Sequence, residues 1–448
     1  MAAIGIYLIY HARATNADIN NDGKVDVSDL SILASNYGLG GKTFSQGDLN
    51  GDGYVTILDI SILAANWGRI TISPPSSINT DCSTDVTDAM QAWLDSVPNN
   101  SVIELKPGAC YRSENTLALI NKTGIILNGN GATIKAITDG SGTSNRYKND
   151  PDWPRNRYHL GIITSTSIQV NNLKIIGPNP SNVYLGNGNF DDTCYNQTLE
   201  AQHGIIVDSS SGVVIDGVTI NNVYGDFVNF TGGSEATWSN GVTLKNSTLS
   251  KNGRQGLGLT GVKNLTVNNN TIDNVCRTAL DLEPNSDTGG VTDAVFQNNT
   301  FGAVRFSFFS AGGRSANIHR ITIQNNNVQR FSFSAETGPL ALPFGRRSGF
   351  YVIGNTRGDP GINEDNMSFV EIDDIIVSGN HNFYQSPKTA KEGVTLNDTN
   401  QVKVYRNDFN NSPAPLGLVG TNTSVIECEN KSNGVYLPTS LVPCPGGL

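Results

Sequence analysis

The sequence has few charged residues and no long apolar run. Only 16% of its 448 residues are Asp, Glu, Lys or Arg, and its net charge is −10. This acidic balance, without any basic stripe, argues against nucleic acid as a partner. No segment is long enough to span a membrane. Cysteine is sparse, at six residues, whereas glycine is abundant, at 48. This mixture is typical of a turn-rich β-solenoid, and not of a helical enzyme or a disordered chain.

The first residues of the chain are apolar. They are followed by Ala12-Arg13-Ala14, which resembles an A-x-A cleavage signal, but no basic segment precedes the apolar stretch. We therefore interpret residues 1–14 as the remnant of a signal peptide or, alternatively, as a frayed tail of the mature protein.

A short phrase of alternating apolar residues ending in Asn recurs along the chain. It reads LTVNNNTI at 265–272, AVFQNNTF at 294–301 and ITIQNNNV at 321–328. The aligned residues, 25 to 29 positions apart, are Asn270, Asn299, Asn326, Asn355, Asn380 and Asn407. A period of this length built on short strands indicates a solenoid. The Asn after each strand suits a turn, and identical Asn residues in adjacent coils can hydrogen-bond along the axis. The sequence therefore predicts an all-β fold, a parallel β-helix.

A second repeat, with a period of 30 residues, lies near the start of the chain. Each copy has oxygen ligands at positions 1, 3, 5 and 12 of a 12-residue loop, and a Gly at position 6, as a calcium loop requires. Position 7 contributes a backbone carbonyl. The predicted ligands are Asp18, Asn20, Asp22, Lys24 and Asp29 in the first loop and Asp48, Asn50, Asp52, Tyr54 and Asp59 in the second. We expect two Ca²⁺ ions, a short helix after each loop (28–36 and 58–66), and pairing of the two loops through Val25 and Val55.

These paired loops resemble a dockerin, the module that joins secreted proteins to cohesin-bearing scaffolds. The resemblance covers residues 15–68 and implies a small all-α calcium-binding domain with a cohesin-like partner. Positions 10–11, which often carry Ser-Thr for cohesin contact, are Val27-Ser28 and Ile57-Leu58 here. A module that folds on calcium and docks elsewhere is the alternative. Residues 69–81, rich in Ser and Pro, read as an extended linker.

Residues 82–448 resemble pectin-lyase-like β-helix proteins. The resemblance rests on a predicted helix over 87–94, which would cap the open end of the solenoid, and on the phrase ILNGNGATI at 126–134. It implies a right-handed parallel β-helix but leaves the reaction open, because such solenoids host lyases, hydrolases, epimerases and adhesins. The pairs Cys82–Cys110 and Cys428–Cys444 would fasten the two ends in an oxidising compartment, whereas six unrelated buried thiols are the alternative.

Four consecutive coils carry an unusual column of polar residues. Aligning their strands stacks His203, Asp226, Gln255 and Thr278 just before the strand, with Arg254 and Arg277 beside them. With Leu280 and Leu282 buried, Asp281 and Glu283 both point outward, their Cα atoms roughly 6.6–7 Å apart. Asn229 should lie on the same face. The candidate catalytic residues are Asp226, Arg254, Asp281, Glu283 and His203.

Three chemistries fit this column. Paired carboxylates suit glycoside hydrolysis. Carboxylates holding a further Ca²⁺, with an Arg or His near the sugar, suit β-elimination of a uronate. His203 could instead act as a general acid–base. Alternatively, Arg254–Asp281 and Arg277–Glu283 are only ion pairs between coils. Polygalacturonases carry Asn-Thr-Asp, Asp-Asp and Gly-His-Gly motifs on successive coils, but here Gln202-His203-Gly204 is only a partial echo of Gly-His-Gly and no Asp-Asp lies in a corresponding coil. The pectate lyase Arg motif is also absent.

Two insertions upstream of the column, at 137–160 and 176–200, carry aromatic and Arg residues suited to sugars and their carboxylates. The expected substrate-binding residues are Trp153, Arg155, Arg157, Tyr158, Arg277 and Gln255. We thus expect a secreted or cell-surface monomer, a polysaccharide lyase or glycoside hydrolase. A non-catalytic adhesin or glycan-binding protein is the alternative.

Overall fold

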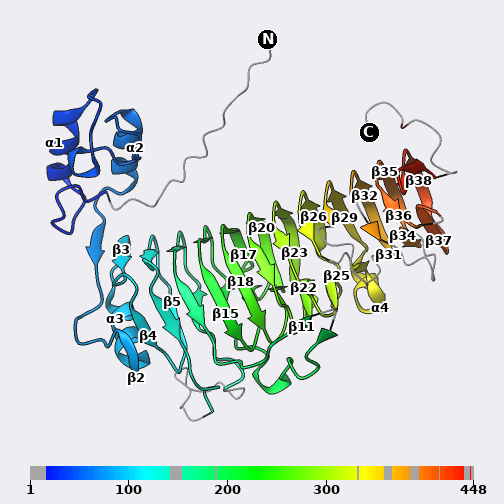
Figure 1. Cartoon of the computed structure of the whole chain (residues 1–448), viewed down its shortest axis with the longest axis horizontal. Coiled ribbons are helices and arrows are strands. Elements are labelled where there is room, and N and C mark those ends of the chain that lie inside the picture. Colours follow the sequence, from blue (N-terminus) through cyan, green and yellow to red (C-terminus); the bar gives the residue numbers. More distant parts are fainter. Residues whose placement is uncertain are drawn as a thin grey trace.

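The computed structural model describes residues 17–141, 154–186, 189–329, 332–357, 366–381, 383–384, 393–412, 414–437 and 444. The predicted signal-peptide remnant and Trp153 lie outside these residues. Most of the described chain forms a right-handed parallel β-helix, an elongated stack of coils with a small helical region at its N-terminal end (Figure 1). This confirms the predicted fold class.

Three parallel sheets run along the solenoid. The 13-stranded sheet contains β1 (Ile70–Ile72), β3 (Ser101–Glu104), β6 (Ile126–Asn128), β9 (Gln169–Asn171), β14 (Val214–Asp216), β17 (Ser239–Lys245), β20 (Gly261–Asn268), β23 (Gly290–Gln297), β26 (Ile318–Gln324), β29 (Arg347–Ile353), β32 (Ile372–Ser378), β35 (Asn400–Tyr405) and β38 (Thr423–Cys428). The 10-stranded sheet contains β2 (Asp81–Asp85), β4 (Cys110–Arg112), β7 (Thr133–Lys135), β10 (Lys174–Ile176), β15 (Thr219–Val223), β18 (Thr248–Asn252), β21 (Thr271–Asp273), β24 (Thr300–Phe301), β27 (Asn327–Val328) and β30 (Thr356–Arg357). The 11-stranded sheet contains β5 (Leu117–Ile120), β8 (Leu160–Ile163), β13 (Ile205–Asp208), β16 (Val228–Thr231), β19 (Leu257–Leu259), β22 (Thr278–Leu282), β25 (Ser307–Ala311), β28 (Ser332–Glu336), β31 (Asn366–Val370), β34 (Val394–Asn397) and β37 (Leu416–Val419).

Short elements decorate these sheets. The two-stranded pairs are β11 (Tyr184–Gly186) with β12 (Asn189–Phe190), β33 (Phe383–Tyr384) with β36 (Phe409–Asn410), and β39 (Lys431–Ser432) with β40 (Val435–Tyr436). The helices are α1 (Val27–Asn36), α2 (Ile57–Ala65), α3 (Thr87–Ser96) and α4 (Gly338–Ala341), with 3₁₀ turns η1 (Phe44–Gln46), η2 (Gln197–Leu199) and η3 (Leu342–Phe344). No helix among the described residues is long and apolar enough to cross a membrane.

The predicted asparagine ladder is present in the solenoid. The amide Nδ2 of Asn270 donates to Oδ1 of Asn299 at 2.9 Å, and Asn299 donates to Asn326 at 3.0 Å. The same bond continues through Asn355, Asn380 and Asn407 to Asn430. The left-handed turn residue is the one before each ladder Asn, such as Asn269 at φ 58°. The ladder side chains are therefore free to hydrogen-bond between coils inside the protein.

The apolar side chains of the coils form one continuous core. Helix α3 closes its N-terminal end, as expected, and buries Met90 and Leu94 there. Buried Gln91 joins α3 to the first coil, because it donates to the carbonyl of Ala118 at 2.8 Å and accepts its N–H at 2.7 Å. Gln91 thereby provides hydrogen-bond partners for the backbone of Ala118 in β5, the otherwise open edge strand of the 11-stranded sheet.

The N-terminal helical region has its own small core, which includes Leu33 and Leu63. Helices α1 and α2 begin within one residue of the predicted positions, after capping boxes at Asp26 and Thr56. The two loops do not pair through Val25 and Val55 as expected. Val25 exchanges backbone bonds with the segment after α2, and Val55 with the segment after α1. The predicted linker also contains β1, which pairs with β3 as the first strand of the 13-stranded sheet.

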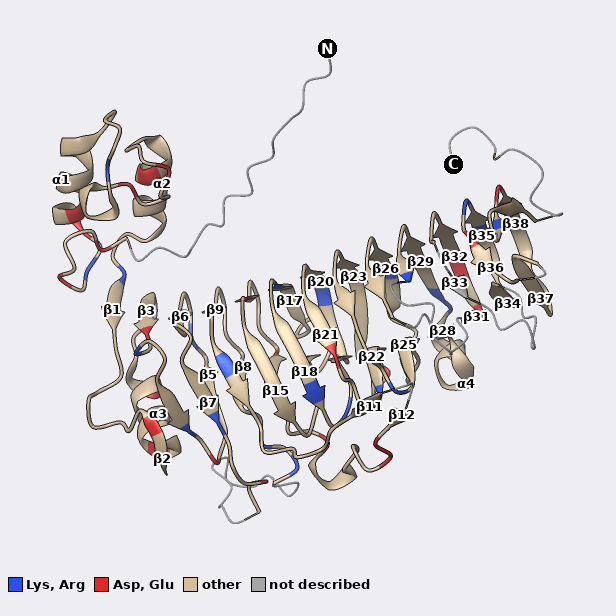
Figure 2. Cartoon of the chain, viewed as in Figure 1, with Lys and Arg blue, Asp and Glu red and all other residues tan. Residues whose placement is uncertain are grey.

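Three disulfide bonds fasten the fold. Cys82–Cys110 and Cys428–Cys444 lie at the two ends of the solenoid, as predicted, and Cys194–Cys276 spans 82 residues in its middle. Figure 2 shows the charged residues scattered along the coils, without a continuous basic stripe on the face drawn.

Candidate functional site

The predicted polar column lies on four successive coils of the 11-stranded sheet. Strands β13, β16, β19 and β22 pair in parallel, and this register aligns His203, Asp226, Gln255 and Thr278. Each side chain accepts the backbone N–H of the next residue in the column. Nδ1 of His203 accepts from Asp226 at 3.0 Å, Oδ1 of Asp226 from Gln255 at 3.1 Å, and Oε1 of Gln255 from Thr278 at 2.7 Å. The column is thus a second ladder, built from different side chains.

Asp226 is the most completely bonded member of this column. Asp226 is fully buried, and both of its carboxylate oxygens accept a hydrogen bond from Nη1 of Arg254 at 3.0 Å. Its Oδ2 also accepts one from Nδ2 of Asn229 at 3.0 Å. Asp226 also raises the pKa of Arg254. Space for this cluster comes from Gly258, where a Cβ atom would lie 2.3 Å from Oδ2 of Asp226. Because every oxygen is engaged by donors, Asp226 is suited to positioning its neighbours and not to proton transfer.

Asp281 has the electrostatics of a proton donor. Its carboxylate is only 7% exposed and accepts Nε2 of Gln255 at 2.8 Å. Burial, together with the negative charge of Glu283, raises the pKa of Asp281 to about 7. Glu283 is exposed and follows β22 directly, so both carboxylates point to the same outer face, as predicted. Asn229 lies on that face too, since it is in register with Gly258 and Asp281.

His203 is held as a neutral ring. Its Nδ1 accepts a backbone N–H, which leaves the proton on Nε2. Burial lowers the pKa of His203 to about 4. The ring stacks on Tyr158, with centroids 5.9 Å apart and an interplanar angle of 4°. In this neutral form His203 can donate a hydrogen bond from Nε2 into the pocket.

An open pocket of about 360 Å³ lies over these residues. Predicted residues on its wall are Arg155, Tyr158, His203, Arg254, Asp281 and Glu283. The structure thus brings together four of the five candidate catalytic residues, with Asp226 directly beneath. The alternative interpretation expected ion pairs Arg254–Asp281 and Arg277–Glu283. Arg254 instead pairs with Asp226, and no ion pair between Arg277 and Glu283 occurs among the described residues.

The sequence interpretation missed Glu200 and Asp208, which also line the pocket. Glu200 forms ion pairs with Arg155 and, at 3.4 Å, with Nε of Arg254, and it accepts the hydroxyl of Tyr195. Burial alone would raise its pKa, but the bonds from Tyr195 and Arg155 outweigh burial and lower the pKa of Glu200. The sequence feature that could have pointed to Glu200 is its position at the end of an insertion rich in aromatic and acidic residues.

Three expected substrate-binding residues lie elsewhere. Arg157 is fully buried and donates to the carbonyl of Thr138 at 2.7 Å and to Oε1 of Gln202 at 2.9 Å, so it stabilises the loop and does not reach a ligand. Gln255 is buried within the column. Arg277 precedes β22 on the same coil as Asp281 and Glu283, but it does not line the pocket, and its guanidinium lies over the ring of Tyr195.

The two N-terminal loops share one conformation. In the first, Oδ2 of Asp18 accepts the N–H of Gly23 at 2.7 Å, and Asp29 accepts those of Ile19 and Asp26 at 2.6 and 2.8 Å. The second loop repeats these bonds at Asp48–Gly53, Asp59–Leu49 and Asp59–Thr56. At position 3 of each loop, Asn20 and Asn50 donate to Asp22 and Asp52.

The donor types of these loops fit a hard divalent cation, because each offers three carboxylates, an amide oxygen and the carbonyl of Lys24 or Tyr54. Gly23 and Gly53 adopt the expected left-handed turn, at φ 88° and 84°. Within the described ranges, however, no group of three or more His, Cys, Asp or Glu side chains is placed to hold a metal ion. The carboxylates instead accept backbone N–H bonds, so calcium here and at the β-helix site stays a prediction.

Comparisons with known proteins support the fold. Residues 160–358 match the family model described as "Right handed beta helix region". No curated protein sequence matches the chain. Among solved structures, the surface adhesin PfbA of Streptococcus pneumoniae has a TM-score of 0.50 at 14% identity, covering 80% of this chain and 100% of that one.

Two carbohydrate-active enzymes are also similar. The catalytic unit of a GH87 α-1,3-glucanase from Streptomyces thermodiastaticus has a TM-score of 0.51 at 16% identity, covering 84% of this chain and 66% of that one. The A-module of the mannuronan C-5 epimerase AlgE4 of Azotobacter vinelandii has a TM-score of 0.49 at 14% identity, covering 82% and 98%. At these identities the likeness concerns the right-handed β-helix fold alone.

Proposed function

We propose that the β-helix is a glycoside hydrolase that cleaves a polysaccharide across the pocket at Asp281 and Glu283. The observation that carries this proposal is the difference between the two carboxylates. Asp281 is buried with its pKa raised to about 7, whereas Glu283 is exposed two residues away on the same face. Hydrolysis of a glycosidic bond needs such a pair, one carboxyl group protonated and the other ionised.

Each residue around the pair has a defined task. Asp281 donates its proton to the leaving-group oxygen, and Glu283 either attacks the sugar or activates a water molecule. Gln255 holds Asp281 through the 2.8 Å bond from Nε2. His203, neutral with its proton on Nε2, offers a hydrogen bond to a sugar hydroxyl. Asp226 and Arg254 form the rigid floor, because their ion pair joins two coils.

Charge favours hydrolysis of a neutral sugar over elimination from a uronate. Both Arg residues of the pocket, Arg155 and Arg254, are already paired with carboxylates. Glu200 is the partner of Arg155, so the acidic groups that remain on the wall are Asp208, Asp281 and Glu283. Among the described residues of the wall, a uronate would meet the negative charges of Asp208 and Glu283 and no unpaired cation to stabilise the enolate that elimination forms.

Reducing ends released from a panel of neutral and acidic polysaccharides test the proposal, with absorbance near 235 nm recorded in parallel. We expect reducing ends without that absorbance, and a loss of about 10²–10⁴-fold in Asp281→Asn and Glu283→Gln. Asp287→Asn, an exposed carboxylate beyond the same strand, is the matched control and should retain activity. Unsaturated products would replace the hydrolase with a lyase. Binding without cleavage, unchanged in both variants, would favour a non-catalytic adhesin. The similar structure PfbA is a surface adhesin.

We further propose that residues 17–68 are a dockerin-like module that binds two Ca²⁺ ions and tethers the protein to a cohesin-like partner outside the cell. The repeated loop conformation and the donor types support the first part. The three disulfides support an oxidising compartment. Calorimetric titration of the full chain with Ca²⁺ should show two sites, and Asp18→Asn and Asp48→Asn should each remove one. An unchanged isotherm in both variants would reject the calcium sites.

A further inference from the structure

The column beside the pocket continues beyond it along the solenoid axis. The N–H of Arg277 donates to the carbonyl of Arg254 at 2.9 Å, and the N–H of Phe306 donates to the carbonyl of Arg277 at 3.1 Å. These three residues therefore occupy one position on three successive coils. Since stacked strands lie about 4.8 Å apart, the backbone of Phe306 lies roughly 10 Å from that of Arg254 along the axis. Phe306 is thus two coils from the pocket floor.

Phe306 and Arg277 form an exposed aromatic–cation surface. The guanidinium of Arg277 lies over the ring of Tyr195, 4.8 Å from its centroid, and 5.9 Å from that of Phe306. The guanidinium of Arg305 lies 4.7 Å from the centroid of Phe306. The side chain of Phe306 is nevertheless 48% exposed, although large apolar residues on the coils are mostly buried. An exposed ring held by cations offers a flat face to a sugar ring.

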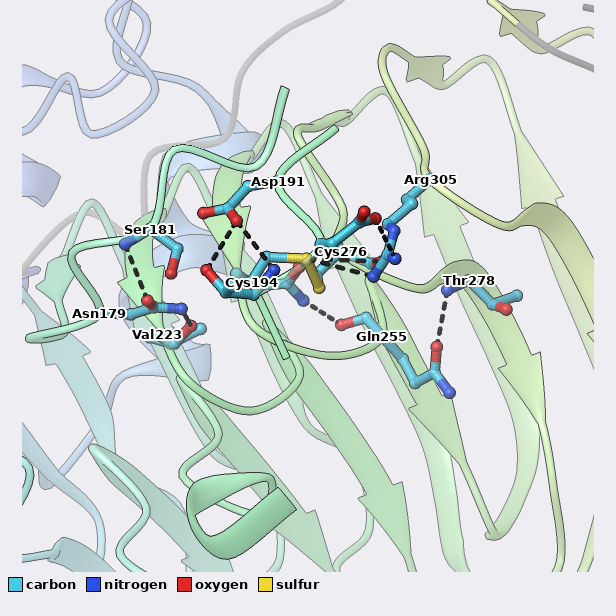
Figure 3. The surroundings of a disulfide bond; sticks show 12 residues. Asn179, Ser181, Asp191, Cys194, Val223, Gln255, Cys276, Thr278 and Arg305 are labelled. Carbon is cyan, nitrogen blue, oxygen red and sulfur yellow. Dashed lines mark hydrogen bonds and ion pairs between the residues drawn. A yellow bond between two sulfur atoms is a disulfide. The ribbon is translucent and has the colours of Figure 1, made fainter. Parts of the chain in front are cut away.

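The Cys194–Cys276 disulfide builds this surface. Tyr195 and Arg277 are the residues that directly follow the two cysteines, so the bond brings the stacked pair together from positions 82 residues apart. Figure 3 shows Arg305 reaching toward the same disulfide, where its Nη1 lies 3.9 Å from Sγ of Cys194. Arg305 is also paired with Asp192 at 2.6 Å. The surface is therefore preorganised before any ligand binds.

Arg277 differs from the arginines near it in its charge balance. Arg155, Arg254 and Arg305 each have a carboxylate partner. In the described part of the chain, no carboxylate lies within ion-pairing distance of Arg277, whose guanidinium contacts only aromatic rings. A half-buried cation without an anionic partner is suited to receive one from a ligand.

We propose that Arg277, Phe306 and Tyr195 form a second sugar subsite, which takes an acidic sugar of the polysaccharide whose neutral unit occupies the pocket. The ring of that sugar stacks on Phe306, and its carboxylate pairs with Arg277. The proposal rests on the proposed function only in that one polymer chain spans both places. It assigns the substrate class as a heteropolysaccharide that contains neutral and acidic units.

Affinity electrophoresis of the full chain carrying Asp281→Asn tests this subsite without turnover. The probes are glucuronoxylan, gum arabic and xanthan, each beside its carboxyl-reduced counterpart. We expect at least one acidic polymer to retard the protein, and carboxyl reduction to weaken that binding about tenfold. Phe306→Ala should weaken binding to both forms about fivefold, whereas Phe306→Trp should retain it.

Arg277→Gln should remove the preference for the acidic form, so that both forms bind equally. Arg314→Gln, which changes an exposed Arg on a neighbouring coil, is the control and should bind like the parent. Equal binding of acidic and reduced polymers by the parent, or no binding of any acidic polymer, would overturn the subsite. If reducing ends still appear in that case, only the subsite is rejected and the proposed hydrolase is retained. If Phe306 is needed for retardation but the wild type cleaves nothing, the subsite is retained and the hydrolase is rejected.

Discussion

Nε2 of Gln255 donates a 2.8 Å hydrogen bond to Oδ2 of Asp281, while Oε1 of the same side chain accepts the N–H of Thr278. The second bond fixes which end of the amide faces Asp281. Asp281 therefore always meets a donor on Oδ2, and its proton must reside on the other oxygen. Gln255, expected from the sequence to contact substrate, instead orients Asp281, the proton donor of the proposed reaction.

Activity should be lost as pH rises through about 7. Burial and then Glu283 raise the pKa of Asp281 to about 7, while Arg254 and Arg277 lower it and Asp226 raises it. The proton needed for catalysis is present below this pH. A profile of kcat/KM against pH should therefore fall on its alkaline side near 7. Because Arg277→Gln removes a positive charge, that fall should move to higher pH, and a shift to lower pH would contradict the assignment.

The same pKa makes stability depend on pH. The folded protein holds the Asp281 proton up to about pH 7, whereas the unfolded chain releases it near the ordinary pKa of 3.8. The folded state thus binds more protons between these values, and the free energy of unfolding falls as pH rises across them. Above pH 7, Asp281→Asn should raise the free energy of unfolding by about 1–3 kcal/mol relative to wild type, measured by urea titration. No gain at pH 8 would indicate that Asp281 ionises freely.

Gly258 should be essential to the pocket. A Cβ atom there would lie 2.3 Å from Oδ2 of Asp226 and 2.7 Å from Nδ2 of Asn229, both buried. Gly258→Ala should therefore displace the Asp226–Arg254 pair and reduce kcat/KM by about 10²-fold. Gly312→Ala is the matched control, since a Cβ atom there meets nothing within 4 Å and its φ is not left-handed. Equal activity of both variants would show that the floor of the pocket does not matter to turnover.

Breaking the buried ion pair should cost more stability than removing a surface pair. Arg254→Gln leaves the fully buried carboxylate of Asp226 without its cation, at a cost of about 3–5 kcal/mol in the free energy of unfolding. Arg320→Gln, which breaks the exposed pair with Asp293, should cost less than about 1 kcal/mol. Urea unfolding of both variants compares them directly, and similar losses would place the first pair in contact with water.

The fold could be predicted because the same short sequence phrase recurs in successive coils. Each coil must place apolar residues inside and an Asn at the same turn, so an error in one phrase is corrected by the next. The column of His203, Asp226 and Gln255 followed from the same register. The roles of its members did not, because Asp226 is saturated by donors from its own coil and from the next one, and no local pattern records that.

The roles of the residues in the insertions could not be predicted from the sequence, for a related reason. The insertions have no period, so no alignment between coils could show that Arg157, which we expected to bind substrate, is buried and that Glu200, which we did not single out, lies at the pocket. The chain buries Arg157 beneath Gly140, where its Nη1 reaches the carbonyl of Thr138, but holds Glu200 at the pocket wall. What separates the two is how each insertion is anchored, and for Glu200 the nearby anchor is the Cys194–Cys276 bond, whose pairing the sequence left open.

Removing that disulfide should weaken both the fold and the binding of substrate. In Cys194→Ser/Cys276→Ser the insertion loses its covalent link to β22, so Tyr195 and Glu200 leave Arg277 and Arg254. We expect the free energy of unfolding to fall by about 2–5 kcal/mol, because the bond closes a long loop. KM for a polysaccharide should rise about tenfold, from the lost preorganisation. Cys428→Ser/Cys444→Ser, which opens a loop at the far end of the solenoid, should lower stability but leave KM unchanged. Equal KM values in the two double variants would show that the anchored insertion does not contribute to substrate binding.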